Sequence, residues 1–361
     1  MRILLATPGT DVGGAERVVI TLAHHLPARG YEVVLWGPAG ALERELEGAA
    51  VHRIVVPHRG RSPAGVLEGV ARLAGAMRRA NPAVVHAHNP RIAALAVLAA
   101  RLGGAPRRPR VLATFHGVRH AEYRAAALLL RGADAVACVS PDLVAGLRAA
   151  GLPAARLRVV PNSVSVPAAR DPEADARLDA ELGLGGAPVV VAIGRLAKQK
   201  NHARFLAAAA RVAEVRPDVR FLLVGDGPLR AELAEQARSL GLDGRVTLTG
   251  VRHDVPAIAA RADLVVFSSD WEGLSLVALE SLAAGTPVLS TPVEGMRDLL
   301  EGGAVIVTGA ATPADLARGM IDLLADPARL EILGARGREL VAARYSTAAM
   351  LDAYERLYRE R

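Results

Sequence analysis

Residues 189–201 of the chain read VVVAIGRLAKQKN. The apolar run 189–193 predicts a buried parallel strand, because strands covered on both faces read as continuous apolar segments. A glycine turn follows, and it carries Arg195, Lys198 and Lys200. Open α/β sheets bind ligands at the carboxyl ends of their strands, so Arg195 and Lys200 are candidates to bind a diphosphate.

The same alternation of short apolar runs and longer helical segments extends through all 361 residues. In the second half it predicts strands at 189–193, 219–224, 245–249, 263–267 and 286–290, and helices such as 202–215 and 228–240. In the first half it predicts strands at 2–7, 31–36, 51–56, 83–87, 110–115, 134–139 and 157–161. Parallel sheets with crossover helices have this pattern, and the length suits two cores. We expect an α/β protein with two Rossmann-like, doubly wound domains.

The domain boundary is expected where the strands stop. Residues 167–188 contain no predicted strand and include several prolines and glycines, which indicates a hinge near 163–187. The segment after Arg344 has a Ser/Thr start and apolar residues at helical spacing, so it predicts one more amphipathic helix. We expect a first domain over 1–165, a second over 166–344 and a terminal helix over 345–361.

Composition limits the classes of protein that fit. Hydrophobic residues make up 51% and charged residues 22%, which is a globular balance. The single cysteine, Cys138, excludes a disulfide scaffold and a cysteine-based zinc site. The apolar residues at the N-terminus are too few for a signal peptide, and no uncharged run reaches the length of about 18 residues that spans a bilayer. We expect a cytoplasmic protein.

Positive charge is concentrated in the first half. Residues 1–165 carry 21 arginines and no lysine against 10 acidic residues, whereas residues 166–361 carry 23 basic against 27 acidic residues. This asymmetry favours an anionic partner for the first half, such as a phosphorylated acceptor, a lipid headgroup surface or nucleic acid. A solvated surface with biased arginine usage is the alternative. The only two lysines, Lys198 and Lys200, lie together in the loop after 189–193, and a compact ammonium suits a phosphate.

Glycines mark two further loops at strand ends. Gly13 and Gly14 stand where a helix begins after the first strand, so the backbone there can approach an anion. The spacing of Gly9, Gly13 and Gly14 does not match the dinucleotide fingerprint, which disfavours a dehydrogenase. Gly225 opens the turn Gly-Asp-Gly-Pro after the strand at 219–224; either this turn contributes to the same ligand site or it is only a turn.

Residues 268–287, SSDWEGLSLVALESLAAGTP, carry two carboxylates. Glu272 lies in a loop after a strand, and Glu280 lies eight positions later on a helix expected to start near Leu274. The amides of 274–277 would then be available to a phosphate, and Glu280 could hold a ribose diol. In the alternative interpretation, Glu280 pairs with an arginine and Glu272 only begins the helix.

Three histidines end strands of the first half. His86 and His88 alternate at the end of 83–87, and His116 follows 110–115. An alternating pair can bind a metal, but no third cluster of ligands accompanies it, so we expect no metal site. Buried, hydrogen-bonded structural histidines are the alternative.

Taken in order, these motifs resemble those of glycosyltransferase family 4, whose members are retaining GT-B enzymes that use nucleotide sugars. The resemblance spans residue 13 to the terminal helix and rests on Gly13-Gly14-Ala15-Glu16, Val85-His86-Ala87-His88, Phe115-His116-Gly117, Val160-Pro161-Asn162, Gly194-Arg195, Lys200-Asn201, Val224-Gly225-Asp226-Gly227-Pro228, and Glu272 with Glu280. It implies two Rossmann-like domains that face a cleft, with the terminal helix crossing back onto the first domain.

The resemblance also implies roles for individual residues. Arg195 and Lys200 would neutralise the donor diphosphate, and His116 would face the reacting sugar. Glu272 would bind the sugar, and Glu280 the ribose. The remaining donor-binding candidates are Gly13, Gly14, Asn162, Gly225, Gly273, Leu274, Ser275 and Leu276, with backbone contacts to the base near Val251 and Arg252. Ser163 stands where the family usually has glycine, so the loop after Asn162 departs from the pattern.

The implied activity is hexosyl transfer from a nucleoside-diphosphate sugar, with UDP favoured over GDP-mannose, to a glycan or lipid-linked acceptor. No D-x-D motif is present, so we expect neither a metal nor any other cofactor. A nucleotide-sugar 2-epimerase of the same fold and a basic nucleic-acid-binding protein are the alternatives. Aromatic residues total 3%, which argues against nucleic acid. Arginines beside the apolar run after His116 are candidates for a basic, partly apolar surface that binds a lipid-linked or anionic acceptor at the inner face of the cell membrane. An ordinary amphipathic packing helix is the alternative. These arginines are Arg101, Arg107, Arg108, Arg110, Arg119, Arg124 and Arg131.

Overall fold

The computed structural model describes residues 1–10, 13–57, 62–103, 107–165 and 171–360. The chain forms two compact units, one of Met1–Asn162 with Thr347–Arg361 and the other of Ser163–Ser346. These boundaries lie within three residues of the positions 165 and 344 that we expect from the sequence. The chain therefore enters the second unit once and returns to the first for its last helix.

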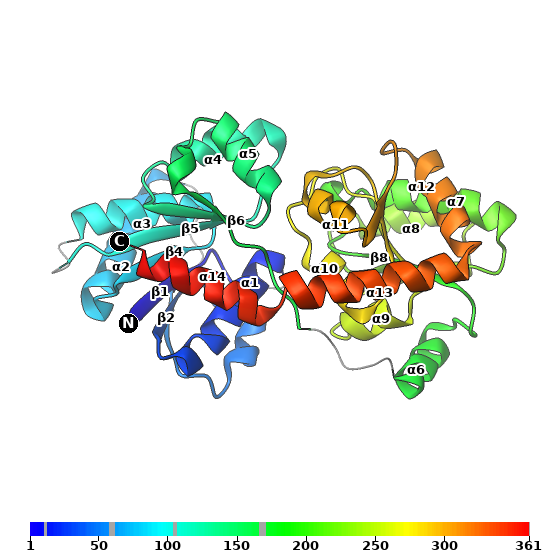
Figure 1. Ribbon diagram of the computed structural model, residues 1–361, viewed down its shortest axis with the longest axis horizontal. Coiled ribbons are helices and arrows are strands. Elements are labelled where there is room, and N and C mark those ends of the chain that lie inside the picture. Colours follow the sequence, from blue (N-terminus) through cyan, green and yellow to red (C-terminus); the bar gives the residue numbers. More distant parts are fainter. Residues whose placement is uncertain (11–12, 58–61, 104–106, 166–170, 361) are drawn as a thin grey trace. The chain divides into compact units, whose positions relative to one another are not determined.

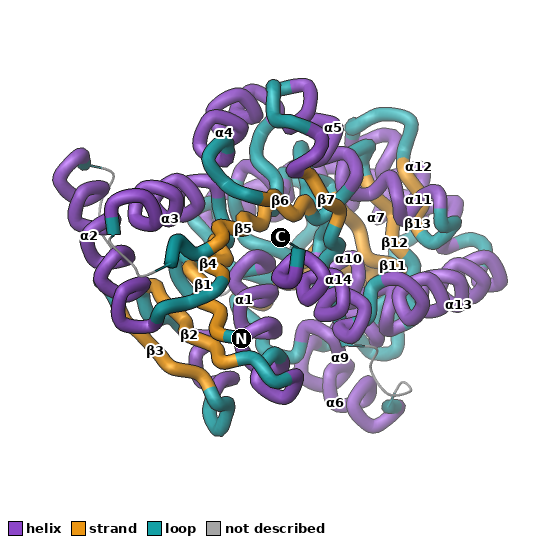
Figure 2. Tube along the Cα trace, turned by 60° about the vertical axis from the view of Figure 1, so that its left-hand side comes forward, coloured by secondary structure: helices purple, strands orange, loops and turns teal. Residues whose placement is uncertain are grey.

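Within the described residues, the first unit contains a seven-stranded parallel sheet in the order β3-β2-β1-β4-β5-β6-β7, which can be followed in Figure 2. Its strands are β1 (Arg2–Ala6), β2 (Glu32–Gly37), β3 (Val51–Val55), β4 (Val84–Ala87), β5 (Arg110–Phe115), β6 (Ala135–Cys138) and β7 (Leu157–Val159). The chain adds β2 and β3 on one side of β1 and then places β4 on the other side. The sheet is therefore doubly wound, with its direction reversing between β1 and β4.

The second unit repeats this plan with six strands in its described part, in the order β10-β9-β8-β11-β12-β13. Its strands are β8 (Val189–Ile193), β9 (Arg220–Val224), β10 (Val246–Gly250), β11 (Leu264–Phe267), β12 (Val288–Ser290) and β13 (Val305–Val307). All five residues of β8 are buried, as expected when helices cover both faces of a parallel sheet. Here the winding direction reverses between β8 and β11.

Helices follow most strands in both units (Figure 1). The first unit has α1 (Gly14–His25), α2 (Pro63–Ala80), α3 (Pro90–Leu102), α4 (Tyr123–Leu130), α5 (Pro141–Ala149) and α14 (Thr347–Arg359). The second has α6 (Pro172–Leu182), α7 (His202–Val215), α8 (Arg230–Ser239), α9 (Val255–Arg261), α10 (Leu276–Ala284), α11 (Arg297–Glu301), α12 (Pro313–Leu324) and α13 (Pro327–Arg344). Several begin with proline after a side-chain cap, such as Asn89 before α3, whose Oδ1 accepts from the Ile92 amide at 2.7 Å.

Each unit has its own apolar core. In the second unit β8, β9 and β11 pack against α7 and α12 through residues such as Phe205 and Met320. In the first unit α14, drawn in red in Figure 1, buries Leu351, Tyr354 and Tyr358 against β1, β2 and α1. The last helix of the chain is thus part of the core of the first unit, and its loss would expose that core.

Three local features differ from the sequence prediction. Strand β13 was not predicted, because an apolar run of three residues at a sheet edge gives little signal. The expected hinge contains a helix, α6, which belongs to the second unit and is capped by Asp171; residues 166–170 of the hinge lie outside the described part. Helix α10 begins at Leu276, two residues after the expected start, because Ser275 is its N-cap.

Candidate active site

The predicted site residues of the second unit lie where the sheet reverses its winding. The loop after β8 carries Gly194, Arg195 and Lys200, and the loop after β11 carries Glu272. These two strands are neighbours, with Val191 of β8 paired to Val265 of β11. Two loops that leave adjacent strands at such a point diverge and leave room for a ligand between them. The fold therefore brings residues 72 positions apart in sequence to one edge of the sheet.

Close backbone approach requires glycine at two positions of this edge. Gly225 has φ +134°, and a Cβ there would lie 2.1 Å from the carbonyl oxygen of Gly194. At Gly227 a Cβ would lie 2.5 Å from the carbonyl oxygen of Leu196. The Gly-Asp-Gly-Pro turn thus packs directly on the loop after β8, and any larger residue would displace it.

An ion pair joins the two loops. Nζ of Lys200 lies 2.6 Å from Oε1 of Glu272, with the two side chains 17% and 6% exposed. The hydroxyl of Ser269 donates to the same Oε1 at 2.5 Å. The Lys200 ammonium also lies 5.8 Å from the centroid of the Phe267 ring. Two donors and an aromatic wall hold this pair in one arrangement, as a binding site requires.

Further hydrogen bonds fix the two loops to each other. Asp270 accepts from Nδ2 of Asn201 at 3.1 Å and from the Arg204 guanidinium at 2.7 Å. Nε2 of Gln199 donates to the carbonyl oxygen of Trp271 at 3.0 Å. Asn201 itself has φ +44° and caps α7 by accepting from the amide of Arg204. These bonds therefore hold the two loops that carry Lys200 and Glu272 in one conformation.

Arg195 and Lys198 differ from Lys200 in their surroundings. Both are exposed. Within the described ranges of the chain, neither makes an ion pair or a side-chain hydrogen bond. Arg195 directly follows the Gly194 turn, so its guanidinium can reach an anion at the end of β8 without first giving up a partner.

The N-terminus of α10 lies next to Glu272. Ser275 caps it by accepting from the amide of Ala278, and the first main-chain bond of the helix runs from the Leu279 amide to the Ser275 carbonyl. The amides of Leu276 and Val277 therefore have no acceptor inside the helix and can bind an anion. From the sequence we expect free amides at 274–277. This range begins two residues too early in the chain, because the helix begins at Leu276.

The loop before α10 is held by backbone contact. A Cβ at Gly295 would lie 1.7 Å from the carbonyl oxygen of Gly273, so only glycine fits there. Leu274 is buried, and Glu272 precedes the helix rather than beginning it. Glu280 is half-buried on α10, one turn beyond the cap.

At the place where backbone contacts to the base are expected, the side chain of Arg252 is held by two carboxylates. Its guanidinium pairs with Asp254 at 2.5 Å and also with Glu181, and these carboxylates raise its pKa. Val251 is 57% exposed and follows β10, whose last residue, Gly250, accepts from the Gly225 amide at 2.9 Å. Any contact with a base at this place is therefore left to the backbone of Val251 and Arg252, because the arginine side chain is already occupied.

In the first unit the glycines lie at a helix start, as expected. Gly13 is the N-cap of α1, with its carbonyl accepting from the Arg17 amide at 2.9 Å, and Gly14 is the first residue of the helix. Asn162 and Ser163 are both buried, and neither has a positive φ. The serine in place of glycine is therefore accommodated without backbone strain.

The three histidines gather on one face of β4 and β5. Nδ1 of His86 is 2.9 Å from the hydroxyl of Tyr358, and Nε2 is 2.7 Å from the hydroxyl of Thr114. His88 is buried too, yet its ring nitrogens have no hydrogen-bond partner in the described structure. Burial lowers the pKa of His116 to about 4, so this imidazole is neutral near pH 7. The prediction of hydrogen-bonded structural histidines holds for His86 and not for His88.

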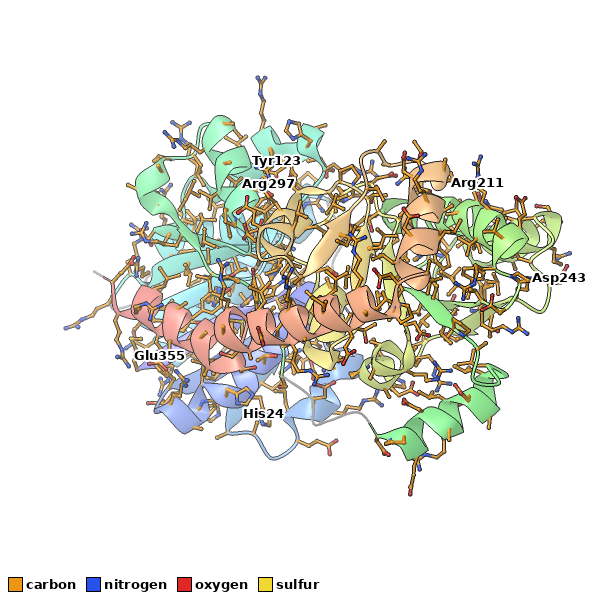
Figure 3. All side chains as sticks on the ribbon, turned by 45° about the vertical axis from the view of Figure 1, so that its right-hand side comes forward. His24, Tyr123, Arg211, Asp243, Arg297 and Glu355 are labelled. Carbon is orange, nitrogen blue, oxygen red and sulfur yellow. The ribbon has the colours of Figure 1, made fainter. Side chains whose placement is uncertain are left out.

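Phe115, the residue before His116, is fixed by an aromatic contact. The ring of Tyr123, labelled in Figure 3 at the start of α4, lies 5.8 Å from that of Phe115 at an angle of 73°. A Cβ at Gly146 would lie 2.2 Å from the Tyr123 ring, so α5 packs closely against it. His116 thus extends from a strand end that is packed on both sides.

The described residues contain neither a cluster of metal-binding side chains nor a helix suited to crossing a membrane. No group of three or more histidine, cysteine, aspartate or glutamate side chains is arranged to hold a metal ion. Among the helices that the structure describes, none combines the length and the apolar character that a membrane span needs.

Comparison with known proteins identifies the family. Two sequence-family models match the chain. The family described as Glycosyltransferase Family 4 matches residues 12–166, and the family described as Glycosyl transferases group 1 matches residues 187–326. The chain is 32% identical to the lipopolysaccharide core biosynthesis glycosyltransferase LpsE of Rhizobium meliloti over 362 residues, which cover 96% of this chain and 95% of LpsE. The chain belongs to glycosyltransferase family 4.

A second relative agrees with this assignment, and two solved structures share the fold of the chain. The chain is 33% identical to a GDP-mannose-dependent phosphatidylinositol monomannoside mannosyltransferase of Mycobacterium tuberculosis, over 70% of each protein. The fold matches Anabaena Alr3699/HepE in complex with UDP and glucose with a TM-score of 0.88, 22% identity and 99% of each chain covered. It matches WaaG with a TM-score of 0.80, 17% identity, and 99% and 100% coverage. The glycosyltransferase therefore has the GT-B fold.

The sequence did not reveal every residue that shapes this glycosyltransferase site. Ser269 was missed, although it precedes Glu272 by three residues and donates to it. Asp270 and Arg204 were missed as well, because their pairing joins two segments that are far apart in sequence. Such pairs leave no periodic signal and become visible only when the loops after β8 and β11 are seen side by side.

Proposed function

We propose that this glycosyltransferase moves a hexosyl group from a UDP-sugar to a glycan or lipid-linked acceptor, with retention of anomeric configuration and without a metal ion. The observation that carries the proposal is the Lys200–Glu272 pair, which lies at the β8/β11 reversal beside Arg195 and the start of α10. This arrangement offers fixed positive charge where a departing nucleoside diphosphate accumulates negative charge.

Lys200 is suited to binding the diphosphate while it stays paired. An ammonium has three N–H donors, and Glu272 uses one of them, so two remain for phosphate oxygens. Arg195 adds a second cation, and the amides of Leu276 and Val277 add dipolar donors. Together these groups supply the stabilisation of the leaving group that other enzymes obtain from a divalent ion.

The same groups define a reaction course. As the bond to the phosphate breaks, the sugar gains oxocarbenium character and the diphosphate gains charge, which Arg195 and Lys200 neutralise. The hydroxyl of the acceptor then forms a bond to the anomeric carbon and loses its proton, and no covalent sugar–enzyme intermediate is invoked. We assign Glu272 the sugar, Glu280 the ribose diol and His116, as a neutral imidazole, a hydroxyl of the reacting sugar.

Relatives support both the donor and the acceptor class, and they leave the base to experiment. HepE was solved with UDP-glucose, whereas the mycobacterial mannosyltransferase is named for GDP-mannose. LpsE is named for lipopolysaccharide core biosynthesis, a lipid-linked glycan. We favour UDP-sugars, with GDP-mannose as the alternative donor.

A patch of the first unit supports an anionic lipid surface as the place where such acceptors are met. We define the α3–α4 patch by its exposed leucines and arginines: Leu98, Arg101, Leu102, Arg124, Leu128 and Arg131. Leu102 and Leu128 are 75% and 70% exposed, and arginines stand within one helical turn of each. Exposed leucines beside arginines suit the interface of an anionic bilayer. Arg110, which was expected in this surface, is bound to Glu360 and the end of α14 instead.

Cosedimentation with vesicles tests the patch. Wild-type protein should bind vesicles of anionic phospholipid at low salt and bind vesicles of zwitterionic lipid less. The double variant Leu102→Gln/Leu128→Gln should lose most of this binding. The matched double variant Val215→Gln/Ile332→Gln changes exposed apolar residues of the second unit, 59% and 54% exposed, and should keep it. If both variants bind the vesicles equally well, the patch does not mediate the binding. The patch then drops out of the proposal as the surface that brings this protein to the inner membrane face.

A two-step experiment tests the transfer itself. Thermal shift against UDP, GDP and ADP identifies the base, because a ligand of the native state raises the apparent melting temperature. Transfer is then measured with the matching nucleotide sugars and lipid-linked or oligosaccharide acceptors, in the presence of EDTA, and the anomeric proton coupling of the product is read by NMR. Retention and undiminished activity in EDTA support the proposal; inversion or loss of activity in EDTA overturns the corresponding part of it.

A further inference from the structure

A buried hydrogen-bonded chain links the last helix of the protein to the neighbours of His116. The hydroxyl of Tyr354 on α14 is 2.9 Å from that of Thr114, which is 2.7 Å from Nε2 of His86. Nδ1 of His86 is 2.9 Å from the hydroxyl of Tyr358, also on α14. All of these residues belong to the first unit. The hydrogen-bonded chain therefore runs through a single folded unit, from α14 to His86 of β4 and Thr114 of β5.

Strand geometry places Thr114, a member of the hydrogen-bonded chain, on the same face of the sheet as His116. Residues 86 of β4 and 112 of β5 are partners in the sheet, and side chains two positions apart on a strand share a face. Thr114 and His116 therefore follow one another on the face that also carries His86 and His88. The ring of His88 lies 4.1 Å from that of His86 and 6.1 Å from that of His116, and the planes of the last two differ by 24°.

The polar contacts fix His86 more firmly than packing alone. Burial keeps His86 neutral, and its pKa is lowered to about 3. In a neutral imidazole one nitrogen donates and the other accepts, so the hydroxyls of Thr114 and Tyr358 take opposite roles, and the two bonds together fix one ring orientation. His88, which the described structure gives no hydrogen-bond partner, is held by the rings on either side of it.

We propose that Tyr354 and Tyr358 of α14 are positioning residues for His116, acting through Thr114, His86 and the ring of His88. The inference rests on the proposed function, because His116 is assigned there to the reacting sugar. It gives the terminal helix a part in catalysis beyond its contribution to the apolar core. A shift of about 1 Å in a group that contacts substrate is enough to slow a reaction by up to about a hundredfold.

Two matched pairs of protein variants test the proposal. Tyr358→Phe removes a hydroxyl bound to His86, whereas Tyr31→Phe removes a buried hydroxyl for which the described residues supply no partner, from a ring 6.1 Å away from that of Tyr358. Thr114→Val keeps the shape of the side chain and removes its hydroxyl, whereas Thr114→Ser keeps the hydroxyl. In each pair only one member breaks the hydrogen-bonded chain, and in the Thr114 pair that member, Thr114→Val, is the one that keeps the packing.

The first readout is steady-state kinetics of sugar transfer. We expect kcat to fall about tenfold in Tyr358→Phe and Thr114→Val with the KM for the donor unchanged, because the variants leave untouched Arg195, Lys200 and Glu280, which we assign to the nucleotide. Tyr31→Phe and Thr114→Ser should keep kcat. Equal kcat in all four variants, or equal losses within each pair, would overturn the proposal. If Tyr358→Phe does not fold, the Thr114 pair decides.

The second readout does not depend on activity. In protein with ¹⁵N-labelled histidine, the ring nitrogen shifts report the tautomers of His86 and His116. We expect Tyr358→Phe and Thr114→Val to change the signals of both histidines, and Tyr31→Phe to change neither. Unchanged His116 signals in the first two variants would show that no positioning occurs. If the wild-type protein transfers no sugar at all, the proposed function fails while these spectra still test the link.

Discussion

Nζ of Lys200 lies 2.6 Å from Oε1 of Glu272, the same oxygen to which the hydroxyl of Ser269 donates at 2.5 Å. Both donors therefore meet one carboxylate oxygen. Among the described residues, the other oxygen of Glu272 accepts no hydrogen bond, and two ammonium N–H groups of Lys200 have no acceptor. The pair is thus a pre-arranged element in which the carboxylate holds the cation at the end of β8.

Ser269→Ala tests whether Glu272 needs this arrangement. Without the hydroxyl, the Glu272 carboxylate is held by Lys200 alone and its orientation is less well fixed. We therefore expect kcat to fall about tenfold. Ser281→Ala is the control, because Ser281 is equally buried and its hydroxyl donates only to the Val277 carbonyl of its own helix. The two variants are compared by kinetics and by melting temperature. A similar fall in kcat in both would show that burial, and not the bond to Glu272, matters.

Glu280→Ala tests the assignment of the ribose. The carboxylate on α10 should bind the 2′- and 3′-hydroxyls, so the variant should bind UDP at least about tenfold more weakly, as expected when a charge-assisted hydrogen bond is lost. Titration calorimetry with UDP and with 2′,3′-dideoxy-UDP makes the test specific. Wild type should prefer UDP, and Glu280→Ala should bind the two nucleotides equally. A preference that survives the substitution would contradict the assignment.

Much of this site was readable from the sequence. Lys200, Glu272 and the glycines of the loops after β8 and β9 stand next to strand ends, and strand ends are visible as the limits of apolar runs. Sequence did not reveal that Arg252 is already paired with Asp254, nor that Ser269 orients Glu272. Side-chain pairing depends on how loops fold back, and that information lies in no single segment.

Gly225→Ala tests the close approach between two loops of the site. At φ +134° a Cβ would collide with the Gly194 carbonyl at 2.1 Å, so we expect a loss of stability of roughly 3 kcal/mol and loss of nucleotide binding. Gly241→Ala is the matched control, because Gly241 also has a positive φ, +68°, and has open space around it. It should cost about 1 kcal/mol and leave binding intact. Denaturant unfolding and UDP titration of both variants give the comparison, and equal losses would refute the steric account.

Buried histidines predict acid sensitivity. Burial lowers the folded-state pKa of His86 to about 3 and of His202 to about 4, and that of His88 well below 6.5. Below pH 6.5 the unfolded chain binds protons at these positions that the folded protein does not, so stability falls as the pH drops toward 4. Each such histidine adds a slope of about 1.4 kcal/mol per pH unit.

Calorimetry between pH 7.5 and 5.0 measures this effect. We expect the melting temperature to change little near pH 7.5 and to fall increasingly below pH 6.5, and His202→Leu to reduce the slope for the second unit. A melting temperature that stays constant from pH 7.5 to 5.0 would show that these histidines are not buried in the folded protein.

We propose that the diphosphate of the donor binds through Lys200 at the β8/β11 reversal. Titration calorimetry of UDP into wild type, Lys200→Ala and Lys198→Ala tests it most directly, because these are the only two lysines and they stand two positions apart. We predict that Lys200→Ala weakens UDP binding by at least about tenfold, as expected for a charged hydrogen bond, and that Lys198→Ala leaves it unchanged. Equal affinities of the wild type and Lys200→Ala would contradict the account.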